Sequence, residues 1–247
     1  MIDLVRRALP VGLVVWSLVL VGEFAPEALA GISVFRVRTH EFHGLRFLDP
    51  GAVLRTAGIG PDASLWDDPG PWEERLARHP LVVRAEIRRR FPSTLVVSVE
   101  EREPVGLVPA PTLVAVDAGG QRLPLDPTRF PLDYPVLRPD GRRGEGSGEV
   151  SDPVGRLARA AAVMRTDAEF WSEVSEVEYA PGGGMIIHRG DPEVLFLLSE
   201  DVEPRRLREG MAVLEDALQR SAGRRPKRVD LRFQEHVFLD WGRGGPP

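Results

Sequence analysis

Two runs of alternating residues, joined by a short turn that contains proline, constrain the fold of this chain more than any other feature. Before Phe91-Pro92-Ser93, the apolar residues Val83, Ala85 and Ile87 fall on one side of an extended backbone, and the charged residues between them fall on the other. After the turn the alternation resumes, with Leu95, Val97 and Val99 as the apolar residues. Two such runs predict a β-hairpin. A three-residue loop places Arg84 opposite Glu100, which is an attractive cross-strand pair.

The residues before this hairpin predict one strand followed by two short helices. Residues 34–43 alternate as a strand does. Asp49 and Pro50 are a typical N-cap and first helical residue, and Gly58 is a typical end for the helix that they begin. A second helix is expected over residues 72–78. The predicted order is therefore strand, helix, helix, strand, strand.

The second half of the chain predicts a mixed β domain with two helices. Expected strands cover residues 113–116, 122–125, 174–179, 185–188, 194–198, 229–233 and 237–241. The helices are expected over residues 153–165 and 204–218, each with apolar residues along one side. Gly182-Gly183-Gly184 reads as a hairpin turn and residues 139–152 as a polar surface loop. The fold class is α+β.

The N-terminus carries a basic start followed by an uncharged apolar run. Arg6 and Arg7 precede residues 8–22, which carry no charge. One interpretation is a signal anchor that stays in the membrane with the arginines inside. The other is a cleavable signal peptide, because Ala28-Leu29-Ala30 before Gly31 has the small-residue pattern of a cleavage site. Both place residues 31–247 outside the cytoplasm.

Composition excludes several classes of function. The chain has 247 residues, a formal net charge of -5 and no cysteine. The acidic balance argues against a nucleic-acid partner. Without cysteine there are no disulfides, no cysteine zinc sites and no thiol nucleophile.

The sequence contains no motif typical of catalysis, cofactor binding or metal binding. His40 and His43 are three residues apart on a predicted strand, so they face opposite sides. Arg88 and Arg90 lie beside several glutamates, which favours a solvated and partly paired sheet face over a phosphate site. No serine lies in a nucleophile elbow. The sequence therefore predicts a protein that binds a partner and is not an enzyme.

Three motifs in order resemble the FtsQ/DivIB family of bacterial cell-division proteins. The first is the hairpin of its polypeptide-transport-associated (POTRA) domain, which is matched here by Pro80, Val83, Ala85, Ile87, Arg89, Pro92, Thr94, Leu95, Glu101, Arg102, Pro104 and Val105. The second is the turn at residues 113–120, followed by Tyr134-Pro135-Val136-Leu137. The third is the pair of closing strands at residues 228–241. The resemblance covers almost the whole chain.

The resemblance implies a membrane protein with two external domains. Its expected parts are a cytoplasmic tail (1–7), a transmembrane signal anchor (8–30), a POTRA domain (31–104), an FtsQ-type β domain (105–241) and a flexible tail (242–247). The resemblance to this family favours a membrane anchor over a cleaved signal peptide. The expected location is the inner membrane at the division septum, with one span and the N-terminus in the cytoplasm.

Family members are scaffolds without enzymatic activity, so the resemblance implies protein partners. The expected partners are FtsB/DivIC and FtsL, which are small single-span coiled-coil proteins, and through them the septal peptidoglycan synthase complex. No cofactor, nucleic acid or small-molecule substrate is expected. The partner is expected to add a strand to the exposed terminal edge of the β domain.

Carried over onto this sequence, the docking strand lies in residues 232–241. The expected partner-binding residues are Arg232, Phe233, Gln234, Glu235, Val237 and Trp241. The alternative reading makes Leu231 and Phe233 ordinary core residues and lets Trp241 cover the end of the sheet.

Two other classes of protein remain as alternatives. POTRA domains also occur in secretion and outer-membrane assembly proteins, but those add a large β-barrel, and the alternating strands of such a barrel are not found here. A cleaved periplasmic enzyme or binding protein would instead have a deep polar cleft.

Overall fold

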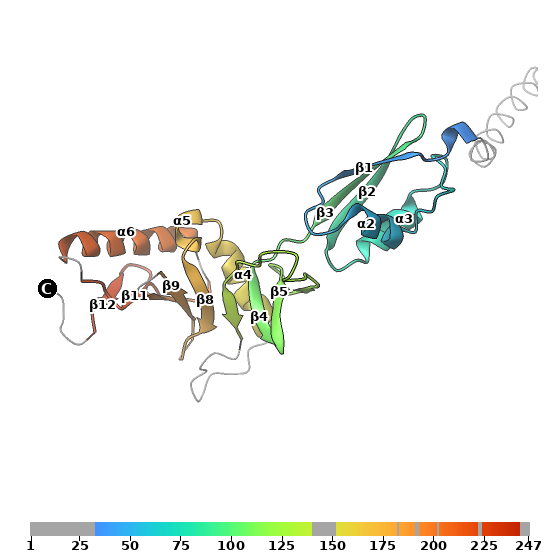
Figure 1. Cartoon of the computed structure of the whole chain (residues 1–247). Coiled ribbons are helices and arrows are strands. Elements are labelled where there is room, and N and C mark those ends of the chain that lie inside the picture. Colours follow the sequence, from blue (N-terminus) through green and yellow to red (C-terminus); the bar gives the residue numbers. More distant parts are fainter. Residues whose placement is uncertain are drawn as a thin grey trace, which may run out of the picture. The chain divides into compact units, whose positions relative to one another are not determined.

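The computed structural model describes residues 33–139, 152–181, 183–190, 193–201, 203–221 and 224–242. The chain divides into two compact units, Met1–Glu101 and Arg102–Pro247 (Figure 1). The predicted cytoplasmic tail and membrane segment, and the tail beyond residue 242, lie outside the described residues. None of the helices within the described ranges is long and apolar enough to cross a bilayer.

Unit 1 has the predicted order of strand, helix, helix, strand, strand. Its elements are a short 3-10 helix η1 (Ser33–Phe35), β1 (Thr39–His43), α2 (Pro50–Ala57), α3 (Gly70–Ala77), β2 (Val82–Arg90) and β3 (Thr94–Glu101). The sheet order is β1-β3-β2, with β1 parallel and β2 antiparallel to β3. One face of the sheet packs on the two helices in a core that includes Val53, Leu65, Trp72, Leu76, Leu95 and Val97.

The first strand is shorter than predicted. Residues 34–38 were expected to belong to it, but Arg36 forms an isolated bridge with Ser64, and the Val37 amide donates to the Ala63 carbonyl at 2.8 Å. These backbone groups pair with the segment between the helices, so the sheet begins only at Thr39.

Side-chain carboxylates fix how the helices and loops of unit 1 meet the sheet. Asp49 caps α2 by accepting from the Ala52 amide at 2.9 Å. Glu73 on α3 accepts from the backbone amide of Ile87 on β2 at 2.6 Å. At the end of β3, Glu101 accepts from the amides of Phe47 (2.7 Å) and Leu48 (2.9 Å). Each carboxylate satisfies backbone donors that have no partner in a helix or ladder.

The hairpin pairs as predicted, with Arg84 opposite Glu100 and residues 91–93 in the turn. The prediction that Val83 shares the buried face was wrong. Val82 pairs with Glu101 and Arg84 with Glu100, so Val83 is the extra residue of a β-bulge. The bulge shifts the alternation by one residue, which buries Val82 and leaves Val83 49% exposed.

Unit 2 is a nine-stranded mixed sheet with helices. The sheet order is β12-β11-β10-β9-β8-β7-β4-β5-β6. The strands are β4 (Gly106–Ala110), β5 (Thr112–Val116), β6 (Arg122–Leu123), β7 (Val136–Arg138), β8 (Val174–Tyr179), β9 (Met185–Arg189), β10 (Val194–Leu198), β11 (Arg228–Asp230) and β12 (Phe238–Asp240). The α+β class is confirmed.

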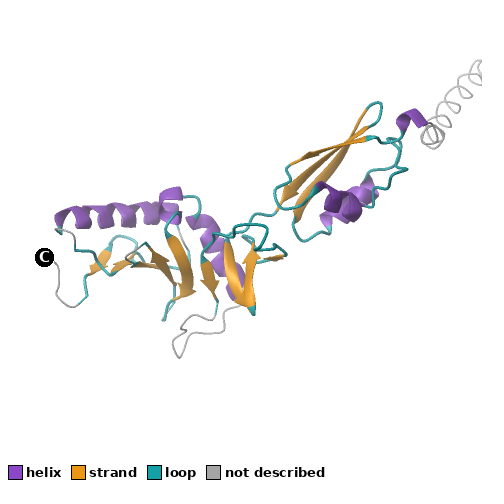
Figure 2. Ribbon diagram, viewed as in Figure 1, coloured by secondary structure: helices purple, strands orange, loops and turns teal. Residues whose placement is uncertain are grey.

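The helices of unit 2 lie on one face of its sheet (Figure 2). They are α4 (Pro153–Met164), α5 (Ala168–Trp171) and α6 (Pro204–Arg220). Their buried residues join alternate residues of the central strands in one core, which includes Leu157, Met164, Phe170, Val177, Ile187, Phe196, Leu207 and Val229. The residues that alternate with these core residues along the strands, such as Glu176, Glu178 and His188, therefore lie on the opposite face of the sheet.

Two helices were predicted in this unit and three are described. The additional helix, α5, is a single turn capped by Asp167, whose carboxylate accepts from the Phe170 amide at 3.0 Å. One turn is too short to produce a recognisable helical period.

We expect Leu95→Ala to destabilise unit 1 by about 2–5 kcal/mol, because Leu95 is fully buried and its loss leaves a cavity. Val83→Ala removes an exposed bulge residue, so its effect should stay within about 0.5 kcal/mol. Urea unfolding followed by the fluorescence of Trp66 and Trp72 measures both. A large effect of Val83→Ala would contradict the bulge.

Candidate functional site

The terminal strand β12 lies at one edge of the unit 2 sheet. It pairs antiparallel with β11, with Val229 opposite Leu239, and it is the last strand in the sheet order. Within the described ranges no other strand pairs with its outer side. An edge strand presents a row of backbone donors and acceptors that another strand can use.

The loop between β11 and β12 is fixed by one arginine of α6. Nη2 of Arg206 donates to the carbonyls of Phe233 (2.7 Å), His236 (3.0 Å) and Leu231 (3.4 Å). The other terminal nitrogen, Nη1, pairs with Glu209 one turn along the helix. One guanidinium therefore contacts three carbonyls of this loop.

Leu231 anchors the start of this loop in the core. Its amide donates to the Leu197 carbonyl at 2.8 Å, and its side chain is buried. Leu231 packs directly on α6 at Gly210, where a Cβ atom would lie 2.7 Å from Leu231 Cδ1. Gly210 therefore allows the loop to approach the helix closely. The alternative reading of Leu231 as a core residue is correct.

Two phenylalanines beside the edge are exposed. Phe233 is 51% and Phe238 is 53% exposed, and their rings meet edge to face with centroids 5.2 Å apart. His236 stacks on Phe238 at 6.0 Å. Large apolar side chains exposed together are typical of interaction surfaces. For Phe233, the alternative reading as a core residue is wrong.

The remaining predicted residues have different environments. Arg232 is already paired within the chain, because its Nε and Nη2 donate to the Asp230 carboxylate at 2.9 and 2.6 Å. Gln234 and Glu235 are exposed at the tip of the loop, and Val237 and Trp241 are partly buried. Of the six, Arg232, Phe233, Gln234 and Glu235 are exposed.

The predicted strands at residues 229–233 and 237–241 are longer than the observed ones. Arg232 and Phe233 lie in the loop, and β12 comprises only Phe238–Asp240. The strands are shorter because side chains bind the backbone of the loop. Arg206 donates to the carbonyls of Leu231 and Phe233, and the Asp230 carboxylate accepts from the Arg232 amide at 3.1 Å. These side chains replace ladder hydrogen bonds.

Sequence analysis did not select His236 and Phe238, although both line this edge. A signal was available for Phe238. If Val237, Leu239 and Trp241 share the face toward the core, alternation puts Phe238 and Asp240 on the outer face.

The Asp230–Arg232 pair shifts the pKa values of both groups. Burial alone would raise the pKa of Asp230, but the hydrogen bonds from Arg232 outweigh it and lower the pKa below the usual 3.8. The same hydrogen bond raises the pKa of Arg232. Both groups are therefore charged near neutral pH.

The basic and histidine motifs of unit 1 form no site. Arg88 pairs with Glu86 at 2.7 Å and Arg90 with Glu41, in agreement with the predicted paired sheet face. His40 is partly buried, which lowers its pKa, whereas His43 is exposed. The two histidines do not converge.

Elsewhere, Glu176, Glu178 and His188 of unit 2 form the one group of described side chains that could hold a metal ion. Burial alone would lower the pKa of His188, but hydrogen bonds to Glu193 and Glu178 raise it above the usual 6.5. Sequence analysis missed this group because its members come from two strands whose register the sequence did not give.

A hollow of about 520 Å³ lies beside α4 in unit 2. Its lining includes Arg156 and Glu200, which pair with each other at 2.7 Å. Because these charges neutralise each other, they do not converge on a ligand.

Comparisons with known proteins agree with the resemblance. A family model described as the FtsQ-type POTRA domain matches residues 35–102. The cell division protein FtsQ of Rhodothermus marinus is 32% identical over 221 residues, which span 83% of this chain and 77% of that protein. The chain belongs to the FtsQ family.

Two other FtsQ proteins match over 226 and 168 residues. The cell division protein FtsQ of Anaeromyxobacter sp. is 29% identical over 226 residues, or 87% of this chain and 74% of that protein. That of Geotalea daltonii is 27% identical over 168 residues, or 64% of this chain and 59% of that protein. The family predicted from the three motifs is therefore confirmed, and the POTRA match covers nearly all of the described part of unit 1, residues 33–101.

We expect Arg206→Met to destabilise unit 2 by about 1 kcal/mol, because one partly buried and two exposed carbonyls lose a charged donor. The loss should appear as faster amide hydrogen exchange in residues 231–237. Arg205→Met is the matched control, because Arg205 is exposed on the same turn and bonds only to Glu209 among the contacts described. Equal exchange in the two variants would contradict the role of Arg206.

The Asp230–Arg232 pair predicts a pH-dependent contribution to stability. Because the pKa of Asp230 is lowered in the folded protein, the stabilisation is present above the usual 3.8 and is lost as the pH falls through the folded-state value. The free energy of unfolding should therefore differ between the wild type and Arg232→Met at pH 6, and the difference should narrow toward pH 3. Urea unfolding at both pH values measures it, and a constant difference would contradict the assignment.

Proposed function

We propose that this FtsQ-family chain is a scaffold of the bacterial division machinery, without enzymatic activity, and that a partner adds a strand at β12. The observation that carries the proposal is the edge of the unit 2 sheet, where Phe233 and Phe238 are exposed beside a strand whose outer side pairs with no strand of the described ranges. The names of the relatives support a role in cell division.

Strand addition has two requirements, and this edge meets both. The first is a row of backbone groups, which the outer side of β12 supplies for hydrogen bonds along the partner. The second is side-chain selectivity. Phe233 and Phe238 offer apolar area, and the exposed Glu235 offers a negative charge beside them. A partner segment with apolar residues and a basic residue fits this pattern.

In this proposal the partners are FtsB/DivIC-type and FtsL-type single-span proteins. Through their complex the chain helps to regulate septal peptidoglycan synthesis. Arg232 positions the loop through Asp230, while Phe233, Gln234 and Glu235 face the partner and Val237 and Trp241 support the strand from the core side.

The proposal also places the chain in the cytoplasmic membrane at the septum. Residues 8–30 form the anchor, residues 1–7 lie in the cytoplasm, and residues 31–247 lie outside. An immunoblot of whole cells tests the anchor, because a product that starts near Gly31 would refute it.

We expect Phe233→Glu and Phe238→Glu to reduce co-purification with FtsB- and FtsL-type proteins at least tenfold. A charge placed in a desolvated contact removes apolar burial and costs more than about 1.4 kcal/mol, which corresponds to a tenfold loss of affinity. The assay is a pull-down of the detergent-solubilised full chain from cells of the source bacterium, followed by mass spectrometry.

The matched control is Phe91→Glu, because Phe91 is a similarly exposed phenylalanine (56%) in unit 1. Circular dichroism of each variant reports whether the chain stays folded. If the variants at Phe233 and Phe238 bind like the wild type while folded, the proposed edge is wrong.

A further inference from the structure

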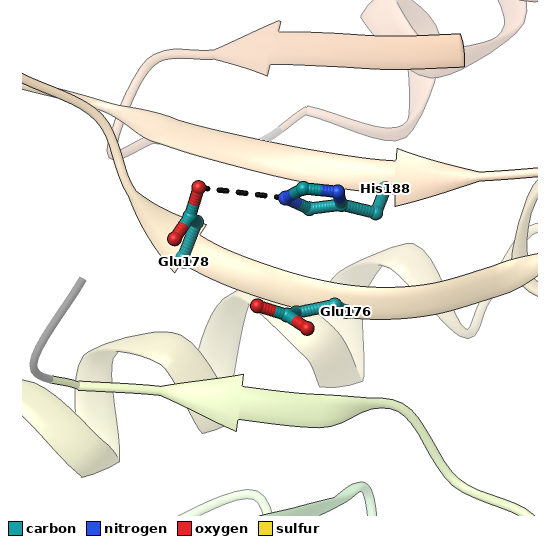
Figure 3. Close-up of side chains that lie close together, drawn as sticks. All are labelled: Glu176, Glu178 and His188. Atoms are coloured by element: carbon teal, nitrogen blue, oxygen red, sulfur yellow. Dashed lines mark hydrogen bonds and ion pairs between the residues drawn. The ribbon is translucent and has the colours of Figure 1, made fainter. Parts of the chain in front are cut away.

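The sheet face of unit 2 opposite the helices carries two glutamates and a histidine close together (Figure 3). Glu176 and Glu178 are two residues apart on β8, so both point to the same face. On the neighbouring strand β9, His188 lies directly opposite Glu176 in the antiparallel register. The strand pairing therefore brings the three side chains together without any loop.

The distances suit a small cation. His188 Nε2 lies 3.4 Å from Glu178 Oε1, and one ligand atom from each of the three residues lies within 4.8 Å of the others. Ligands about 2.1 Å from a tetrahedral zinc ion lie about 3.4 Å apart. The His188–Glu178 pair already has this spacing, and binding requires the side chain of Glu176 to turn from Arg138 toward the ion.

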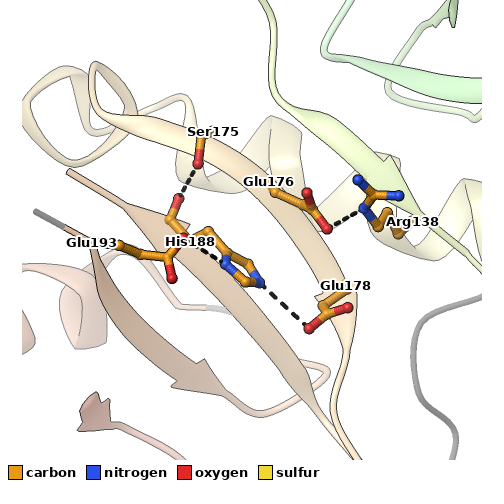
Figure 4. A network of polar contacts seen from close by, with 6 residues as sticks. All are labelled: Arg138, Ser175, Glu176, Glu178, His188 and Glu193. Carbon is orange, nitrogen blue, oxygen red and sulfur yellow. Dashed lines mark hydrogen bonds and ion pairs between the residues drawn. The ribbon is translucent and has the colours of Figure 1, made fainter. Parts of the chain in front are cut away.

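A fourth residue fixes the orientation of the imidazole ring. Nδ1 of His188 lies 2.9 Å from Glu193 Oε1 (Figure 4). An ionised carboxylate only accepts hydrogen bonds, so Nδ1 carries the proton and donates. Nε2 is then the nitrogen that faces Glu178. A carboxylate behind a histidine is the usual partner of a histidine that binds metal through its other nitrogen.

The local charge also favours a divalent cation. Three carboxylates, those of Glu176, Glu178 and Glu193, surround the ring. Arg138 on β7 contributes one positive charge and pairs with Glu176. With a neutral imidazole, the group has an excess of two negative charges, which one divalent ion neutralises.

We propose that Glu176, Glu178 and His188 bind a divalent ion of the Zn²⁺ class. One nitrogen and two carboxylate oxygens suit zinc, whereas Mg²⁺ and Ca²⁺ prefer oxygen ligands alone. The bound ion joins β8 to β9 on the face without helices, and Glu193 holds His188 in the binding orientation. This site is independent of the proposed docking edge at β12, so either can fail without the other.

Isothermal titration of the full chain in detergent, with affinity tags removed and metal stripped by a chelator, tests the site. We expect one Zn²⁺ per chain and much weaker binding of Mg²⁺ and Ca²⁺. His188→Ala and Glu178→Gln should each weaken Zn²⁺ binding at least tenfold. Glu193→Gln leaves the three ligands in place and should weaken binding about 10–100-fold.

Two variants separate the site from a general effect of charge. Arg138→Met removes the cation that competes for Glu176, so Zn²⁺ should bind more tightly. Glu200→Gln removes one negative charge at Arg156, away from the cluster, and should change nothing. Circular dichroism confirms that each variant is folded.

A second measurement uses Co²⁺ in place of Zn²⁺. Its visible absorption bands should appear with the wild type and Glu200→Gln, and they should be lost with His188→Ala. The proposal is overturned if the wild type binds Zn²⁺ no more tightly than folded His188→Ala, or if Arg138→Met weakens binding.

Discussion

Helices bury only one face of the unit 2 sheet. The polar groups of the other face, and the backbone groups of the edge strands, must find their partners without help from helices, and this constraint shapes the whole unit. Alternate residues of β8, β9 and β10 bury Val177, Ile187 and Phe196 beneath the helices. The residues between them are therefore committed to the opposite face. The same pairing that builds the core thus sets which polar groups meet outside it. Among the described residues it also leaves β12 as the last strand of the sheet, with no strand on its outer side.

Much of the fold could be predicted from the sequence where local rules and tertiary packing agree. The hairpin register of Arg84 with Glu100 follows from the alternation and the turn length. Helix α2 begins and ends at its predicted residues, because Asp49, Pro50 and Gly58 act through local backbone chemistry. The predictions that were wrong depend on distant partners. The bulge at Val83 and the late start of the first strand, at Thr39 and not at residue 34, are set by pairing that alternation does not encode.

For the candidate sites too, residues that a local motif marks could be predicted, whereas those that depend on distant partners could not. Phe233 could be found because the closing motif of the family contains it, whereas the loop around it depends on Arg206, which is 27 residues earlier in the chain. His188 showed no motif, because its carboxylate neighbours lie on another strand and reach it only through a register that contains an irregularity between Val174 and Glu176. A sequence pattern shows which residues share a strand face, but not which strand lies next to it.

The contact of Arg206 with three loop carbonyls has a consequence for any partner strand. A strand that docks on a disordered edge must order that edge as well as itself, and the entropy of that ordering is subtracted from the affinity. Here α6 already holds residues 231–236 in one conformation through the carbonyls of Leu231, Phe233 and His236. If a partner strand docks here as proposed, it meets a preorganised loop, and the entropic cost of association is borne mainly by the incoming strand.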